Sequence, residues 1–237
     1  MRVRLYIPEA ENGKEAAISK DQVRHLKVLR LKEGDKIGIY DGKGHEFETT
    51  YSGKVREGKA LLEKTITPRE EPKVKITLAT AVPKGARMDI LIEKVSEIGV
   101  SNIVPMICSR SVVEPKEAKE RWRKIVIEAC SQSERSIVPT ISEPIKFADL
   151  LSTIKEYNHA FICHPTGLPL MKEYCECPST LLIVGPEGDF TPAELDAAKE
   201  AGCTPVSLGP TILRTETAGI VAVAQIVALS QKLYKPA

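Results

Sequence analysis

The sequence has few aromatic residues, no dinucleotide-binding glycine motif and no apolar run long enough to cross a bilayer. Four Phe, six Tyr and one Trp among 237 residues argue against an aromatic stacking platform for single-stranded nucleic acid. Neither G-x-G-x-x-G nor a P-loop lysine motif follows a predicted strand, so nucleoside recognition would have to use other loops. The longest apolar segment, Gly219–Leu229, is far shorter than the roughly 20 residues that span a membrane.

The chain carries almost no net charge, because 34 Lys and Arg residues oppose 32 Asp and Glu residues. Any nucleic-acid surface must therefore be a local patch rather than a global field. Arg2, Arg4, Glu9 and Glu11 interrupt the first apolar residues, which is not the pattern of a signal peptide. We expect a cytoplasmic protein that does not contact a membrane.

The six cysteines predict core packing more than metal binding. Most of them lie in apolar runs, where a free thiol behaves as a small apolar side chain. Cys175 and Cys177, with Cys163 and His164 upstream, could be imagined as a metal site. Their spacing matches no usual zinc pattern, so we expect no bound metal.

Residues 1–70 predict a small, mostly β domain that resembles a barrel. Val3–Ile7 alternates between apolar and polar residues, as a half-buried strand does. Ser19–Gln22 has the pattern of a capping box at the start of a helix. Lys36–Tyr51 reads as two strands joined by a turn at Asp41-Gly42, a strong hairpin signal.

A second domain is predicted over residues 73–237. Pro68 and Pro72 enclose three charged residues and cannot continue a helix or a central strand, so the boundary is placed there. Beyond it strands alternate with helices, which predicts a parallel, helix-covered α/β sheet. One long helix is expected to begin near Pro115, with Trp122 on its inner face.

The last quarter of the chain holds two strand–loop–helix units. In the first, the apolar run Thr180–Val184 leads into the loop Gly185–Phe190 and a helix that opens at Thr191. In the second, Thr204–Leu208 leads into the loop Gly209–Thr217 and a very apolar helix. Loops at the carboxyl ends of parallel strands line the ligand crevice, so these two predict a small-molecule site.

Two charged side chains in these loops are candidates for function. Glu187 projects from a Gly-Pro-Glu-Gly turn whose glycines allow a ligand to approach; the alternative is a well-formed turn that binds nothing. Arg214 stands at a helix start, where the helix dipole opposes a cation, and so calls for a phosphate or carboxylate partner. The alternative is a capped, buried helix whose Arg214–Glu216 pair has no function.

Three polar clusters have weaker signals. The cations within 116–124 usually form a solvated helix face, and 128–135 on its own is a polar helix end. His25, beside Arg24 and Arg30, is either part of a phosphate-binding patch or a packing residue.

Together, Gly185–Phe190 and Leu208–Ala218 closely resemble the SPOUT-class methyltransferases, and more narrowly the bacterial small-subunit ribosomal RNA uridine-N3 methyltransferase family. The resemblance covers essentially the whole chain, with His25–Asp35 matching the family's PUA-like RNA-binding domain. The family's middle motifs match 84–88, 97–100, 109–113 and 128–135. Two positions depart from the pattern: Asp189 replaces a second glycine, and Cys108 replaces an acidic or hydroxyl residue.

The resemblance implies an α/β fold with a C-terminal trefoil-knotted SPOUT domain and a small N-terminal PUA-like β-barrel. It implies S-adenosylmethionine as cofactor, methylation of N3 of a uridine in 16S rRNA or the assembled small subunit, and a homodimer paired through Gly219–Leu229. By carry-over, the catalytic candidates are Arg214 and Glu187. The cofactor-binding candidates are Gly185, Gly188, Leu208, Gly209, Leu213 and Thr217. The RNA-binding candidates are Arg4, Arg24, His25, Arg30 and Arg135.

Two other functions stay open at this point. The chain could be a SPOUT methyltransferase that acts on another RNA or on ribose. It could also be a non-catalytic PUA-type RNA-binding factor for ribosome assembly, with a vestigial cofactor pocket. The intact loops around Gly185 and Arg214 speak against the second alternative.

Overall fold

A computed structural model describes residues 3–232 and divides into two compact units. The first comprises the residues up to Glu71 together with Ile127–Val138, and the second comprises Pro72–Val126 and the residues from Pro139 onward. The predicted division into domains 1–70 and 73–237 places Ile127–Val138 in the second domain. In the structure this segment packs with the first unit, for a reason given below.

The first unit is built on a four-stranded sheet. Its order is β1 (Arg4–Tyr6), β3 (Lys36–Tyr40), β4 (Glu46–Thr50) and β6 (Lys64–Ile66). β1 runs parallel to β3, and the other neighbours are antiparallel. The unit is completed by the strand pair β2 (Glu15–Ala17) and β5 (Lys59–Leu61) and by helices α1 (Lys20–Val28) and α2 (Gly53–Arg56).

Local signals in this unit act as predicted. The turn between β3 and β4 is fixed by Asp41, whose Oδ1 accepts the N–H groups of Lys43 and His45. Ser19 caps α1 by accepting the N–H of Gln22, while the Gln22 side chain accepts the N–H of Ser19. Both the hairpin and the capping box are therefore confirmed.

Arg4 lies inside the first unit. Its Nη2 is 2.9 Å from Glu46 Oε2, and its Nη1 donates to the carbonyl oxygens of Cys130 and Arg135. Arg135 in turn is 2.7 Å from Glu71. These bonds attach Ile127–Val138 to the rest of the first unit. Arg4 and Arg135 have only 7% and 8% of their surfaces exposed, and each is paired with a carboxylate, so their charges serve the fold. That they bind RNA stays a prediction, and their burial argues against it.

The second unit is a parallel sheet. Its order is β10 (Ile145–Lys146), β8 (Asn102–Ile107), β7 (Lys75–Ala81), β12 (Ser179–Val184), β11 (His159–Pro169) and β13 (Thr204–Ser207), with β9 (Thr140–Ile141) also paired to β8. The strands do not follow chain order, because β12 lies between β7 and β11 while β13 pairs with β11 at the edge. Threading of the chain into a trefoil knot stays a prediction.

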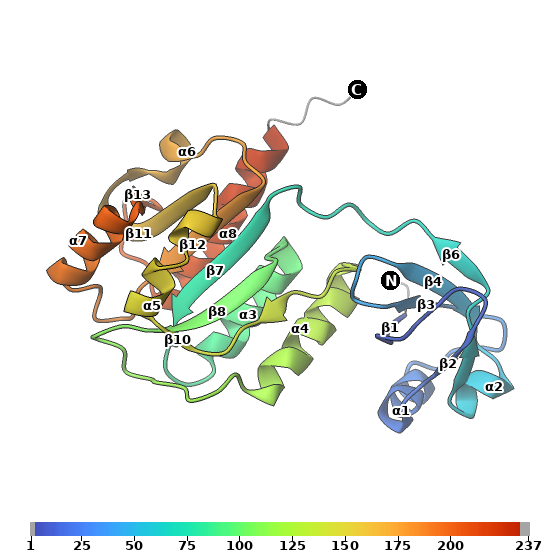
Figure 1. Cartoon of the computed structure of the whole chain (residues 1–237). Helices are drawn as coiled ribbons and strands as arrows, with labels where there is room; N and C mark the ends of the chain where they lie inside the picture. Colours follow the sequence, from blue (N-terminus) through green and yellow to red (C-terminus); the bar gives the residue numbers. More distant parts are fainter. Residues whose placement is uncertain (1–2, 233–237) are drawn as a thin grey trace. The chain divides into compact units, whose positions relative to one another are not determined.

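Helices cover both faces of this sheet, as Figure 1 shows. On one face lie α3 (Arg87–Ile98) and α8 (Thr215–Lys232), so close that a Cβ on Gly219 would be 2.7 Å from Leu91 Cδ1. On the other face α5 (Phe147–Leu151) and α7 (Pro192–Ala201) share a core with Leu181 and Ile183. The unit also contains α6 (Leu170–Glu173), the 3₁₀ turn η1 (Ile154–Glu156) and the start of α4 (Glu120–Ser133). Burial on both faces explains why the strands are apolar nearly throughout.

Two helix predictions differ from the structure. The long helix α4 begins at Glu120 rather than near Pro115, and the Ala118 N–H donates to the Glu143 carboxylate instead of entering a helix. The expected helix around Leu150 ends after one turn, because the hydroxyls of Ser152 and Thr153 donate to carbonyl oxygens three residues earlier.

Candidate active site

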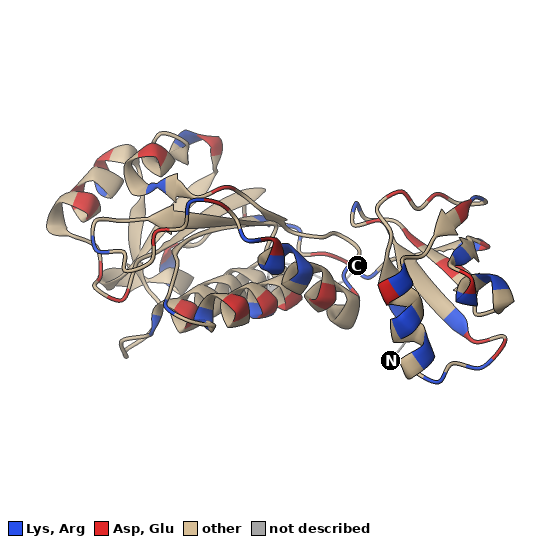
Figure 2. Cartoon of the chain, turned by 90° about the horizontal axis from the view of Figure 1, so that it is seen from below, with Lys and Arg blue, Asp and Glu red and all other residues tan. Residues whose placement is uncertain are grey.

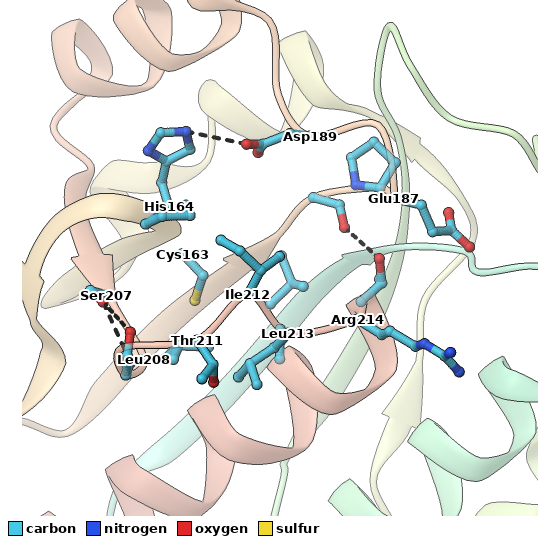
Figure 3. A pocket seen from close by; sticks show the side chains of 17 residues that line it. Cys163, His164, Glu187, Asp189, Ser207, Leu208, Thr211, Ile212, Leu213 and Arg214 are labelled. Carbon is cyan, nitrogen blue, oxygen red and sulfur yellow. Dashed lines mark hydrogen bonds and ion pairs between the residues drawn. The ribbon is translucent and has the colours of Figure 1, made fainter.

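The loops that follow β12 and β13 enclose a pocket of about 320 Å³ together with the irregular middle of β11, where Cys163, His164 and Pro165 lie (Figure 3). These segments meet because the three strands are neighbours in the parallel sheet. The pocket is lined by Cys163, His164, Pro165, Val184, Gly185, Pro186, Glu187, Asp189, Ser207, Leu208, Gly209, Thr211, Ile212, Leu213, Arg214, Thr215 and Ala218. Both loops singled out in the sequence contribute, and a third segment comes from the register shift within β11.

The loop after β12 is held in place by one hydrogen bond to its backbone and by close packing. The Gly185 carbonyl accepts the hydroxyl of Thr215, the first residue of α8, at 3.0 Å. A Cβ on Gly185 would lie 2.8 Å from the ring of Phe190, which is buried against Phe147 with 5.4 Å between ring centroids. Glycine is therefore required here by close packing, and the loop and α8 are joined into one wall of the pocket.

Glu187 is partly engaged by the protein itself. Its Oε1 accepts the Lys84 N–H at 3.4 Å and lies 3.7 Å from Arg87 Nη1. Arg87 Nε also lies 3.8 Å from Glu216 Oε1. The cation beside Glu187 is therefore Arg87. The only sequence signal for Arg87 was its place in the 84–88 motif.

Arg214 immediately precedes α8 and is exposed at the pocket. In the close-up its guanidinium points away from the apolar wall formed by Ile212 and Leu213, on the side where Glu187 also lies (Figure 3). Within residues 3–232 no carboxylate forms an ion pair with Arg214. The guanidinium at this helix start is thus available for an anionic ligand.

The predicted cofactor-binding residues fall into two groups. Gly185, Leu208, Gly209 and Leu213 line the pocket. Gly188 and Thr217 do not belong to its lining. The Gly188 carbonyl instead accepts from Arg110 at 3.0 Å. Thr215, two residues before Thr217, takes the lining position and was missed in the sequence.

Asp189 adopts a backbone conformation that favours glycine, with φ of 61°. This explains why glycine suits the position and why an Asp, which tolerates that region, can replace it. The carboxylate accepts the Phe190 N–H through Oδ1, and Oδ2 lies 3.3 Å from His164 Nε2. The His164 Nδ1 accepts the Thr166 N–H, so Nε2 carries the proton toward Asp189. The pair connects the middle of β11 to the loop after β12.

The cysteines show no nucleophile at this site. Burial raises the pKa of the Cys163 thiol, which lines the pocket, to about 12, so the thiol is protonated at neutral pH. His159 Nε2 lies 2.8 Å from Cys175 Sγ outside the pocket lining. Among the residues that the structure describes, no group of three or more His, Cys, Asp or Glu side chains is arranged to hold a metal ion.

The remaining RNA-binding candidates lie on or just after α1. Arg24 and His25 are exposed on the helix, and Arg30 is exposed two residues after it ends. The Arg24 guanidinium lies 3.5 Å from Asp21, with both side chains largely in solvent, so the ion pair is weak and leaves Arg24 accessible. An RNA role for these three residues stays a prediction.

Matches with known families follow the same division of the chain. An RNA methyltransferase domain matches residues 69–227, and an RNA methyltransferase PUA domain matches residues 18–60. The chain belongs to the RNA methyltransferase family. The predicted fold class, an α/β parallel-sheet domain with an N-terminal PUA-like domain, is confirmed.

Named relatives of this methyltransferase are similar over nearly the whole chain. The ribosomal RNA small subunit methyltransferase E of Synechocystis sp. is 33% identical over 97% of this chain and 78% of its own. The Bacillus subtilis protein of the same name is 30% identical over 94% of each chain. The crystal structure of ribosomal RNA small subunit methyltransferase E from Neisseria gonorrhoeae, bound to S-adenosyl methionine, has a TM-score of 0.88 at 33% identity and covers 97% of this chain and 98% of its own.

Proposed function

We propose that this methyltransferase transfers a methyl group from S-adenosylmethionine to N3 of one uridine in 16S ribosomal RNA. The observation that carries the proposal is the pocket formed by β11 and the loops after β12 and β13, with the unpaired guanidinium of Arg214 at its edge. The names of the relatives support the small-subunit substrate, and the cofactor bound to the Neisseria gonorrhoeae protein supports S-adenosylmethionine.

The pocket fits such a cofactor in size and chemistry. Its volume lies within the range of about 300–1,000 Å³ that small-molecule sites occupy, and its walls combine apolar side chains with exposed loop backbone. Gly185, Leu208, Gly209 and Leu213 would hold the cofactor. Its sulfonium supplies an activated methyl group.

The chemistry requires N3 of the uracil to lose a proton. N3 lies on the pairing edge, so the base must be unpaired or flipped to reach the pocket. Arg214 would stabilise the negative charge that spreads onto the uracil oxygens. Glu187 has two candidate roles, as the proton acceptor or as a loop residue held by Lys84 and Arg87.

We also propose that the protein is a cytoplasmic homodimer. Large apolar side chains are exposed near the pocket loops, among them Ile212 (81% exposed), Leu168 (60%) and Met171 (58%). α8 is apolar over most of its length, and its side chains Ile220, Val221, Val227 and Leu229 are only partly buried. A second copy would bury these groups.

Within residues 3–232 no helix is both long and apolar enough to cross a membrane.

The direct test is methyl transfer from labelled S-adenosylmethionine to intact small subunits and to naked ribosomal RNA, with the modified nucleoside mapped by mass spectrometry. We expect 3-methyluridine at one position of 16S rRNA. A methylated ribose or a product in tRNA would instead support the alternative substrates. An absence of both methyl transfer and cofactor binding would favour the alternative of a non-catalytic ribosome-assembly factor.

The His164–Asp189 contact should strengthen cofactor binding by holding two pocket segments together. Asp189→Gly is expected to weaken binding about tenfold or less, the range of one ordinary hydrogen bond, because the pair is half exposed to solvent. The protein should stay folded, because glycine suits φ of 61°. His164→Ala should have a similar effect, and the double variant should lose no more than either single one. Calorimetric titration measures this, with Asp196→Ala on the outer surface of α7 as control. Additive losses would show that the two residues act independently.

A further inference from the structure

The first unit contains a groove of about 990 Å³ that the proposed reaction does not use. Its walls come from β1 and the residues after it, from α1, and from the last two turns of α4, all within the first unit. It is lined by Val3, Arg4, Leu5, Tyr6, Ile7, Pro8, Glu9, Ala17, Ser19, Asp21, Gln22, His25, Leu29, Ile127, Glu128, Ser131 and Gln132.

Some of these polar side chains serve the fold, and others are available to a ligand. Arg4 is paired with Glu46, and the Gln22 side chain is consumed by the α1 cap and the Tyr6 carbonyl. In the part of the chain that the structure describes, the side chains of His25, Glu128 and Gln132 have no hydrogen-bond or ion-pair partner. A large hollow whose walls combine apolar and aromatic side chains with a few available polar groups is typical of a ligand site.

The aromatic ring of Tyr6, which lines the groove, is fixed in place by its neighbours. Tyr6 packs against Tyr40 with 5.5 Å between ring centroids, and a Cβ on Gly42 would be 2.8 Å from the Tyr6 ring. Packing on that side restricts the ring before any ligand arrives. His25 and Leu29, which is 42% exposed, line the same groove from α1 and offer further flat or apolar contact.

The charges of the groove do not favour a phosphate as its occupant. Among residues 3–232, Glu9 and Glu128 contribute carboxylates that have no ion-pair partner, and the guanidinium of Arg4, which also lines the groove, is already paired with Glu46. Exposed cations lie instead along α1, whose Lys and Arg residues are blue in Figure 2. They are Lys20, Arg24 and Lys27, followed by Arg30. The chain thus places hydrogen-bond acceptors in the groove and positive charge beside it.

We propose that this groove binds an unpaired nucleobase that carries an exocyclic amino group, with the α1 cations holding the flanking phosphates. Glu128 accepts hydrogen bonds from the amino group, and the Gln132 amide pairs with the remaining base edge. The Tyr6 ring and Leu29 pack against the base, as side chains do in recognition of single-stranded RNA. Adenine, cytosine and guanine fit this description, whereas uracil has no amino group. The inference rests on the proposed function, since it takes ribosomal RNA as the ligand.

The test is fluorescence anisotropy of the full chain with labelled single-stranded RNAs of about eight nucleotides, a length typical of such sites. Oligo(A), oligo(C) and oligo(U) are compared at one fixed salt concentration, because phosphate contacts depend on salt. We expect oligo(A) and oligo(C) to bind about tenfold more tightly than oligo(U), as one well-made base contact provides. Glu128→Ala and Gln132→Ala should abolish most of this preference. Glu120→Ala, on the first turn of α4 and outside the groove, should retain it.

Three results would overturn the proposal. In the first, both groove variants keep the base preference. In the second, they weaken all three RNAs equally, which would make the groove a backbone contact. In the third, they weaken binding to assembled small subunits but not to any RNA, which would indicate a basic protein segment as the occupant. Methyl transfer to small subunits by the unsubstituted protein is measured in parallel. If it occurs while one of these three results is obtained, the groove proposal fails and the proposed function stands; if it does not occur, the proposed function fails.

Discussion

Arg214→Ala is expected to reduce methyl transfer at least about a hundredfold while leaving cofactor affinity nearly unchanged, since removing one group that stabilises transition-state charge has effects of that size. The guanidinium is exposed at the pocket and forms no ion pair within residues 3–232, so its loss breaks no contact that holds the fold. Single-turnover methylation and calorimetric titration of S-adenosylmethionine, carried out on the same preparation, measure the two quantities.

Arg214→Lys is the matched variant, because it keeps the charge but loses the planar fork of donors. We expect activity between those of the unsubstituted protein and the alanine variant. Full activity in Arg214→Ala would remove this residue from the chemistry. A loss of cofactor affinity equal to the loss of rate would make Arg214 a binding residue instead.

Gly185→Val is expected to lower cofactor affinity by roughly ten- to a hundredfold, the effect of forcing extra methyl groups into a packed site at about 1–3 kcal/mol. A Cβ at this position would already be 2.8 Å from the Phe190 ring, and valine adds two more carbons. Because Phe190 is buried against Phe147, the loop must move and the bond from Thr215 to the Gly185 carbonyl must break. Calorimetry with S-adenosylmethionine measures the loss.

Thermal unfolding must accompany this measurement, because part of the strain will destabilise the fold. Gly53→Val is the matched control, since nothing lies within 4 Å of its Cβ position and its φ is not in the left-handed region. This control should bind the cofactor normally. Unchanged affinity in a folded Gly185→Val protein would place the cofactor site elsewhere.

Some of the site was predictable because its signals are local. The α7 start shows this: Thr191 accepts the N–H of Glu194 and the Glu194 carboxylate accepts the N–H of Thr191, as the capping-box pattern implies. The Gly-Pro-Glu-Gly sequence before it likewise marks a tight turn, because glycine allows close approach of the backbone and proline stiffens the turn. Helix caps, turns and strand alternation involve residues within a few positions of each other, so the chain specifies them directly.

Other parts of the site depend on contacts between distant residues. Arg87 approaches both Glu187 and Glu216, which are about a hundred or more positions away in the chain, and no spacing rule connects them. Asp189 was noticed only as a departure from a family pattern. Its partner His164 lies close to it only because β11 and β12 are neighbours in the sheet.

The sequence by itself determined the elements of this protein: a β-rich first unit, alternating strands and helices after residue 72, and two glycine-containing loops that carry Glu187 and Arg214. The tertiary structure alone decided which loops meet, because the order β12, β11, β13 is set by packing across the whole sheet. It also decided that Arg4 and Arg135 are internal. An arginine looks the same in the sequence whether its side chain is exposed or buried. Only the structure shows that the carboxylates of Glu46 and Glu71 pair with these two inside the fold.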